Sequence, residues 1–140
     1  MSNIELLEKT LPVAPLKIVA MESCRELGQK VNDYIVSFRE NTISEASESS
    51  LYVNYRSNNY LVDCCCPRFG TGEAKGVLRE TIRGTDLFIM TDVCNYSLTY
   101  SVSGHLNHMS PDDHFQDLKR IISAATGKAH RINVIMPFLY

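Results

Sequence analysis

The sequence lacks several features that would place a protein in a specialised class at once. It has no apolar run close to the ~20 residues that cross a bilayer, and its start lacks the charged-then-apolar order of a signal peptide. Its formal net charge is -2, without the basic excess typical of nucleic-acid binding. It also contains no internal repeat and no low-complexity tract. These absences favour a cytoplasmic protein that partners neither a membrane nor a nucleic acid.

A disulfide framework is absent as well. The five cysteines are an odd number, no C-x-x-C pair occurs, and Cys64, Cys65 and Cys66 are consecutive. Adjacent residues in a strand point to opposite faces, so three in a row converge poorly on one metal ion. We therefore expect reduced thiols that act as small buried hydrophobes, with a metal site as the weaker alternative.

The bulk composition is that of an ordinary globular domain. Hydrophobic residues make up 44% of the 140 residues and charged residues 21%, which is enough to build one core. Pro12 and Pro15 bracket a short apolar stretch near the start, and proline disrupts regular structure. We expect an N-terminal extension over residues 1–16 and a single domain over residues 17–140.

The first half of the domain predicts a strand over Leu16–Met21 and a helix from Glu22 to Phe38. Apolar residues recur in this helix at spacings of three and four, the signature of one buried face. They are Leu27, Val31, Tyr34, Ile35 and Phe38. The polar segment 40–50 predicts a solvated loop or a short exposed helix.

A hairpin is predicted next, from apolar runs over 51–55 and 60–66 that are joined by a polar turn at 56–59. Further strands are expected over Val77–Ile82, where apolar and polar residues alternate, and over Asp86–Thr91, which reads as an interior strand of a parallel sheet. The segment 96–109 gives no clear assignment.

The clearest local signal is the start of a helix at Ser110. Ser110 has the properties of an N-cap, and Pro111 at the first helical position is followed by acidic residues in the first turn. The helix is expected to run to about Thr126 and to stop at Gly127. A last strand over Ile132–Met136 completes an α/β pattern with a mixed sheet.

Three segments, in this order and spacing, resemble ribose-phosphate diphosphokinases (PRPP synthetases). The loop Arg68–Glu73 resembles the family's Arg-Phe-(Ser/Pro)-Asp-Gly-Glu loop. Ile82–Ile89 resembles its Val-Arg-Gly-x-Asp-Val-(Phe/Tyr)-Ile segment. Residues 112–140 resemble its Asn-Asp-x-(Leu/Met) helix and the following strand that ends in Pro-Tyr-(Phe/Leu)-x-Tyr. The resemblance covers roughly residues 17–140.

The resemblance implies an α/β, three-layer phosphoribosyltransferase-like domain with a mixed, mainly parallel sheet and a hairpin. Family members bind ATP, ribose 5-phosphate and Mg2+ between two such domains and transfer a pyrophosphoryl group to the sugar. By resemblance, Phe69 would stack on adenine and Glu73 would hydrogen-bond to it. The family loop serves the ATP of a neighbouring subunit, so a homo-oligomer, often a hexamer, is also implied.

Two departures from the family pattern bear on this reading. Thr71 stands where the family has aspartate, and a hydroxyl cannot supply a carboxylate's charge. The property that this substitution bears on is the affinity or specificity for adenine. Segment 35–67 is also longer than the family norm. The family's catalytic loop and ribose-phosphate loop lie beyond the residue that matches Tyr140. We therefore expect an amino-terminal half of the enzyme that holds no catalytic residues and no metal ligands, and is inactive alone.

Other interpretations of the same residues stay open. His105, His108 and His114 lie near Asp112 and Asp113 and could hold Zn2+, but helix capping and surface roles are favoured for this group.

Arg83 is either a phosphate ligand or the partner of Asp86 or another acid near the turn. At the level of function, the alternatives are a non-catalytic regulatory or interaction module of the same descent and an unrelated small α/β domain. The unrelated domain would lack a strand pair leading into the loop Phe69–Glu73.

Overall fold

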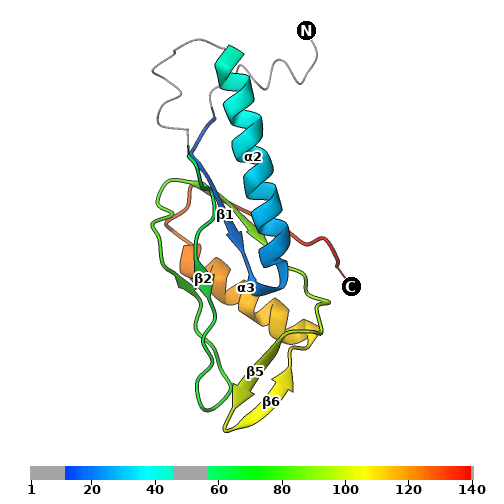
Figure 1. The fold of residues 1–140 in the computed structure, drawn as a ribbon. Coiled ribbons are helices and arrows are strands. Elements are labelled where there is room, and N and C mark those ends of the chain that lie inside the picture. Colours follow the sequence, from blue (N-terminus) through cyan, green and yellow to red (C-terminus); the bar gives the residue numbers. More distant parts are fainter. Residues whose placement is uncertain (1–11, 46–56, 140) are drawn as a thin grey trace.

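The computed structural model describes residues 12–45 and 57–139. Its centre is a parallel three-stranded sheet in the order β1-β4-β7, formed by β1 (Leu16–Ala20), β4 (Asp86–Met90) and β7 (Arg131–Ile135) (Figure 1). Two small antiparallel hairpins complete the strands. One pairs β2 (Cys64–Cys65) with β3 (Val77–Leu78), and the other pairs β5 (Thr99–Val102) with β6 (His105–His108).

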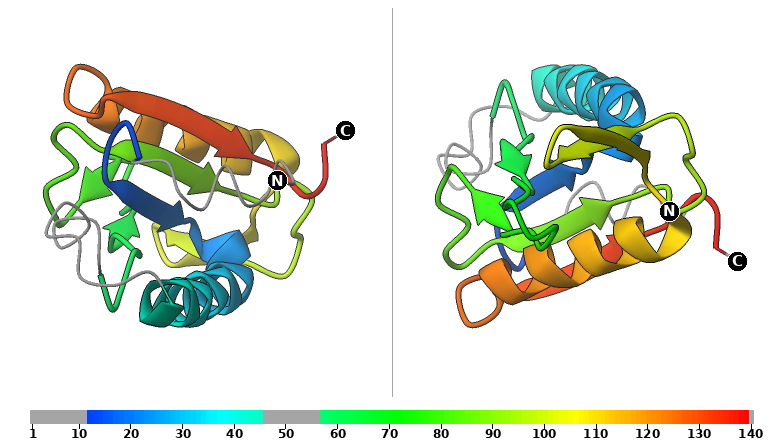
Figure 2. Two further views of the ribbon diagram at one scale, coloured as in Figure 1. Left: turned by 90° about the horizontal axis from the view of Figure 1, so that it is seen from above. Right: turned by 90° about the horizontal axis from the view of Figure 1, so that it is seen from below.

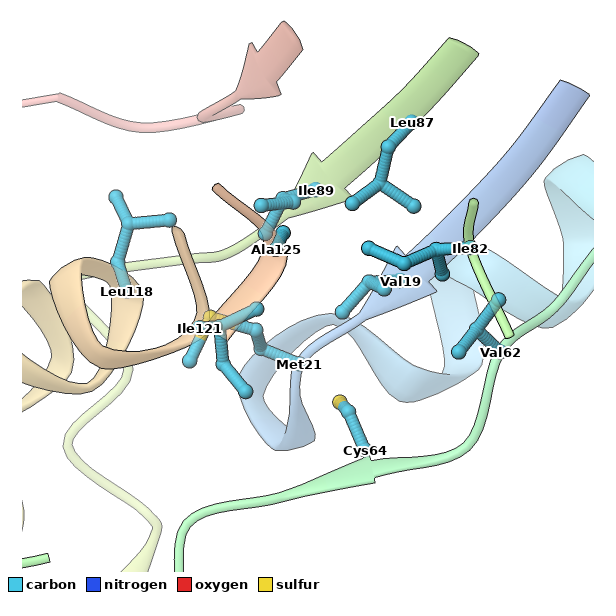
Figure 3. Close-up of a cluster of buried hydrophobic side chains, with 10 residues drawn as sticks. All are labelled: Val19, Met21, Val62, Cys64, Ile82, Leu87, Ile89, Leu118, Ile121 and Ala125. Atoms are coloured by element: carbon cyan, nitrogen blue, oxygen red, sulfur yellow. The ribbon is translucent and has the colours of Figure 1, made fainter. Parts of the chain in front are cut away.

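The sheet separates two layers, because side chains along each strand alternate between its faces. Val19, Leu87 and Ile89 point into the larger core cluster together with Leu118, Ile121 and Ala125 of helix α3 (Pro111–Ala125) (Figure 3). Val62 and Cys64 join this cluster from the β2 side. The views along the sheet show α3 and α2 (Arg25–Glu45) on opposite sides of it (Figure 2). The α/β, three-layer fold is therefore confirmed, although the central sheet is wholly parallel and the antiparallel pairs form two separate hairpins.

The opposite face of the sheet is covered by α2, which follows a 3-10 turn, η1 (Glu22–Cys24). Ile18 and Met90 belong to a second, smaller cluster of buried side chains on this face, and Val31 and Ile35 of α2 pack against it. The helix approaches β1 closely at Gly28, where an added Cβ would lie 2.3 Å from the Cβ of Ala20.

The predicted apolar face of this helix is correct only in part. Val31 and Ile35 pack inward, but Leu27, Tyr34 and Phe38 are exposed, Tyr34 by 72%. The close approach to β1 turns the small and polar side of the helix toward the sheet. Asn32 is buried there and accepts a hydrogen bond from the backbone N–H of Tyr60 at 2.8 Å. The helix also continues to Glu45, into the segment predicted as a loop or a short exposed helix.

The hairpin predicted around the turn 56–59 differs from the one observed. Its first strand, 51–55, lies outside the described residues. In the second, regular pairing is limited to Cys64–Cys65, and the antiparallel partner is Val77–Leu78. Residues 60–62 instead run along β1, where Ile18 and Leu61 form a parallel bridge. The strand predicted over 77–82 is correspondingly shorter, because it pairs only at two positions.

The segment 96–109, which gave no assignment from sequence, forms the β5–β6 hairpin. Gly104 at its turn has φ +80° and Ser103 has φ +50°, backbone conformations that suit a tight reversal. The strands β1, β4 and β7 and the helix α3 lie within one or two residues of their predicted bounds. No helix in the ranges that the structure describes is long and apolar enough to cross a membrane.

Candidate functional site

The loop singled out from sequence is the connection between β2 and β3. Arg68 and Ala74 form an antiparallel bridge at its base. Within the loop, the N–H of Phe69 donates to the carbonyl of Glu73 at 2.8 Å, and the N–H of Gly72 donates to the carbonyl of Phe69 at 2.9 Å. Gly72 has φ +96°, a conformation that side chains disfavour, so glycine is required there. The strand pair leading into the loop is therefore present.

The three predicted site residues lie together on this tight loop. Phe69 is 49% exposed, and Thr71 and Glu73 are exposed as well. The hydroxyl of Thr71 donates a hydrogen bond to the carboxylate of Glu73. This bond lowers the pKa of Glu73 below its ordinary value, because it favours the charged form. The loop thus displays an aromatic ring and an ionised acid to solvent.

The base of the loop is fixed by a buried ion pair. Arg68 donates two hydrogen bonds to the carboxylate of Asp117 on α3, each at 2.9 Å. Only 9% of the Arg68 side chain and 7% of the Asp117 side chain are exposed. Arg120 donates to the same carboxylate at 2.6 Å. A bidentate guanidinium–carboxylate contact fixes orientation as well as distance, so the loop is tied to the helix in a defined direction.

The strand that leaves the loop also lies against α3. A Cβ added to Gly76 would lie 2.5 Å from the carbonyl oxygen of Arg120, closer than any side chain tolerates. Glycine at this position therefore permits the backbones of the hairpin and the helix to meet. Together with the ion pair, this contact seats the β2–β3 hairpin on α3.

A cavity of about 280 Å³ lies behind the loop, between the end of β1, the β2 strand and the β5–β6 hairpin. The cysteine run and Arg68 line one side, Tyr100 the hairpin side, and His114 and Asp117 the α3 side. Arg68 and Asp117 neutralise each other within it. The remaining lining is mainly apolar and also includes Glu22, Ser23 and Thr99.

The predicted burial of the cysteine run is confirmed at Cys64, whereas Cys65 and Cys66 are half-buried. Cys64 is buried in the larger core cluster, and Cys66 packs against that cluster. Burial raises the pKa of Cys64 to about 11 and that of Cys66 to about 12, so both remain neutral thiols. Cys65 is half-buried and lies outside the cluster, where Arg79 donates to its sulfur at 3.7 Å.

The histidine and aspartate group serves the start of α3. Asp113 and Ser110 form a reciprocal capping box, in which each side chain bonds the other residue's backbone N–H. Burial opposes the charge on Asp113, but the hydrogen bonds from Ser110 outweigh it and hold the pKa of Asp113 below its ordinary value. His114 is buried, with Nε2 at 2.6 Å from the carbonyl oxygen of Asn95. The capping interpretation is confirmed for Asp113.

The remaining histidines lie on the β5–β6 hairpin. His108 stacks on Tyr96 at 4.7 Å between ring centroids, and His105 is exposed. Within residues 12–45 and 57–139, no group of three or more His, Cys, Asp or Glu residues could hold a metal ion.

The suggested pairing of Arg83 with Asp86 is wrong. Asp86 faces Arg131 across the β4–β7 register, and the two side chains form an ion pair at 2.5 Å. Arg83 is exposed beside a small hollow that Thr81 and Lys128 also line. The register of the sheet, which the sequence pattern did not fix, decides the partner of Asp86.

Sequence reasoning missed the residues that hold the loop, Asp117 and Tyr100. Both contact Arg68 across more than 30 positions of the chain, and no local pattern links them. The one available signal was Asp117 itself, an acid on the apolar face of α3 one residue before Leu118. A charge in that place indicates a buried partner.

A family model described as the N-terminal domain of ribose phosphate pyrophosphokinase matches residues 16–140. A search of curated proteins gave no match. The matched range contains every helix and strand described above, including the hairpin that carries Phe69 and Glu73. An unrelated α/β domain with accidental matches is thereby excluded. The chain belongs to the family of N-terminal domains of ribose phosphate pyrophosphokinase.

Proposed function

We propose that this domain supplies part of the adenine site of a ribose-phosphate diphosphokinase, which transfers pyrophosphate from ATP to ribose 5-phosphate and releases PRPP and AMP. The observation that carries the proposal is the half-exposed ring of Phe69 on a loop that is fixed at its base. An exposed ring on a rigid loop offers a flat surface for a purine, and stacking of this kind is worth about 1–3 kcal/mol.

Glu73 complements the ring. Its lowered pKa keeps the carboxylate ionised at neutral pH, and an ionised carboxylate accepts hydrogen bonds only. The exocyclic amine of adenine donates two, whereas guanine presents a carbonyl oxygen at the corresponding position. An acceptor beside a stacking ring therefore favours adenine over guanine. Thr71 occupies one side of the carboxylate and leaves the rest of it available to the base.

The other substrates need groups beyond this loop. Mg2+ takes oxygen ligands and is usually held by one or two carboxylates together with substrate phosphates. The described ranges contain no carboxylate cluster that would hold the ion by itself. The domain would therefore contribute to binding the base, while metal and phosphates are bound by other groups, and we derive no step through the ion.

Self-association is part of the proposal. The edge strand β7 exposes Val134 and Ile135, and Phe138 and Leu139 follow it with more than half of their surface exposed. An unpaired strand edge flanked by exposed apolar residues favours association. We expect a dimer or a larger assembly in light scattering, and a monomer at every concentration would contradict this expectation.

Calorimetric titration of the 140-residue chain with ATP tests the adenine site. Phe69→Ala should weaken ATP binding by about 10–100-fold, the equivalent of ~1–3 kcal/mol of lost stacking. Tyr34→Ala is the matched control, because Tyr34 is an exposed aromatic residue on the outer side of α2. GTP should bind more weakly than ATP. Equal ATP affinities for wild type and Phe69→Ala would refute the site.

A non-catalytic regulatory module remains the second candidate, and Thr71 in place of an acid is the observation that favours it. The two candidates differ in turnover. A full-length protein that contains this domain should form AMP from ATP and ribose 5-phosphate in a Mg2+-dependent reaction if the enzyme proposal holds. A regulatory module would bind an intact synthetase and show no turnover of its own.

A further inference from the structure

The β5–β6 hairpin contacts the candidate nucleotide loop at two places. The ring of Tyr100 on β5 lies 4.6 Å from the guanidinium carbon of Arg68. The hydroxyl of Ser103, at the hairpin turn, donates to the carbonyl of Gly70 at 3.4 Å. Figure 1 shows the hairpin and the β2–β3 connection together at one end of the molecule. The hairpin thus touches the loop residues on both sides of Phe69.

The contact with Tyr100 completes the enclosure of Arg68. One edge of the guanidinium bonds to Asp117 through two nitrogens, and one face lies over the Tyr100 ring. The aromatic ring presents its negative face to the cation, and the low exposure of Arg68 strengthens this attraction. Without Tyr100, water would reach the face of the guanidinium and compete for the Asp117 carboxylate.

The hairpin itself is anchored to α3. The carbonyl oxygen of Asn95, at the start of the hairpin segment, lies 2.6 Å from the ring nitrogen of the buried His114. At the base of the hairpin, His108 stacks on Tyr96 and contacts the Tyr96 carbonyl oxygen at 3.0 Å. Tyr100 therefore projects from an element whose position is set by the same helix that holds Asp117.

The loop needs such an anchor because it buries little of its own surface. Phe69, Thr71 and Glu73 are all exposed, so they contribute little apolar burial that would hold the loop in one conformation. Its internal order rests on two backbone hydrogen bonds and on Arg68. The orientation of the Phe69 ring then depends on how rigidly Arg68, the preceding residue, is fixed.

We propose that the β5–β6 hairpin is a positioning element for the candidate nucleotide loop, and that Tyr100 acts on Phe69 through Arg68. Its relevance to nucleotide binding rests on the function proposed above. In this proposal, Tyr100 does not contact the base itself. It restricts the loop to the conformation that presents Phe69, so that less order must be imposed when the nucleotide binds.

The test uses hydrogen exchange of the Phe69 and Gly72 amides, followed by NMR in the 140-residue chain without nucleotide. Both amides donate within the loop. Tyr100→Leu should raise their exchange rates about tenfold, within the range for a desolvated cation–π contact. Tyr100→Phe keeps the ring and should restore slow exchange. Tyr34→Leu removes an exposed aromatic residue from α2, which contacts neither the hairpin nor the loop through this ring, and should leave both amides unchanged.

ATP titration of the same variants separates this inference from the proposed function. Tyr100→Leu should also weaken ATP binding about tenfold, with Tyr100→Phe near wild type. Unchanged exchange in Tyr100→Leu, or faster exchange in Tyr34→Leu as well, would overturn the positioning role whatever the ATP result. If wild type binds no ATP, the proposed function fails. The exchange rates then still decide whether the hairpin holds the loop.

Discussion

The ion pair between Arg68 and Asp117 gives the sharpest prediction for stability. Both side chains are more than nine-tenths buried, and two parallel hydrogen bonds of 2.9 Å join them. Removing one partner of a buried pair typically costs about 3–5 kcal/mol, because the other charge is left without compensation. The cost at each position depends on what remains beside the surviving charge.

In Arg68→Met, the Asp117 carboxylate keeps its bond from Arg120 at 2.6 Å. We therefore expect a loss of about 2–3 kcal/mol, below the usual range for a broken buried pair. Asp117→Leu removes the carboxylate to which both Arg68 and Arg120 donate, and should cost about 3–5 kcal/mol. The double variant replaces both charges by apolar groups and should be less destabilised than the sum of the two by roughly 2–3 kcal/mol.

Urea unfolding followed by circular dichroism measures these differences, which are large against the ~5–15 kcal/mol that stabilises a typical domain. The matched control is Arg79→Met. Arg79 also pairs with an aspartate, Asp63, at 3.3 Å, but both side chains are more than half exposed. Such a pair contributes only about 0–1 kcal/mol. Additive costs in the double variant, or equal costs for Arg68→Met and Arg79→Met, would refute the buried-pair reasoning.

Two further predictions concern the loop and its return strand. Gly76→Ala should destabilise the domain by about 1–3 kcal/mol, because its Cβ would overlap the α3 backbone, whereas Gly70→Ala meets no atom within 4 Å and should change stability little; thermal unfolding of both variants checks this. Thr71→Val should raise the pKa of Glu73 toward its ordinary value in an NMR titration. Since the folded-state pKa is the lowered one, the Thr71–Glu73 bond stabilises the fold above the ordinary pKa, and this contribution is lost as pH falls through the folded value. A Glu73 pKa unaffected by Thr71→Val would contradict that cause.

The central sheet and α3 were predictable because their signals are local. After Asp86, every residue of β4 is apolar, so both faces of the strand are apolar, as expected for a strand with a helical layer on each side. The structure buries four of the five residues of β4. Ser110 and Asp113 carry a capping pattern that needs only three residues of separation. Each of these elements is specified by residues within a few positions of one another.

The orientation of α2 was not predictable from periodicity. Its apolar residues form a regular stripe, yet Leu27 and Tyr34 on that stripe are exposed. The helix approaches β1 at Gly28, and its buried Asn32 bonds to the backbone of Tyr60; neither residue counts as apolar in a pattern of this kind. Hydrophobic spacing identifies the helix, but the small residue at the closest approach decides which side faces the sheet.

The pairing of β2 was missed for a different reason. A strand that pairs at two positions has too few residues for an alternating pattern to specify its partner. The position of the loop was nevertheless anticipated from its resemblance to the family, because Phe69 and Glu73 carry that resemblance themselves. What remained hidden was the support from Asp117 and Tyr100, which depends on the folded chain bringing α3 and β5 to the same arginine.

The exchange of the family's aspartate for Thr71 has a physical consequence that bears on the choice between the two candidate functions. An aspartate at this position would place a second carboxylate near Glu73, and like charges at short range raise each other's pKa. Threonine instead donates to Glu73 and keeps its pKa low. The loop loses one negative charge but retains one ionised acceptor beside an exposed aromatic ring. Stacking and hydrogen bonding to an adenine amine require that acceptor and that ring, and neither requires the second charge. Under the adenine-site proposal, the substitution therefore leaves the two groups that would contact the base in place, and the titration of Phe69→Ala with ATP tests that proposal directly.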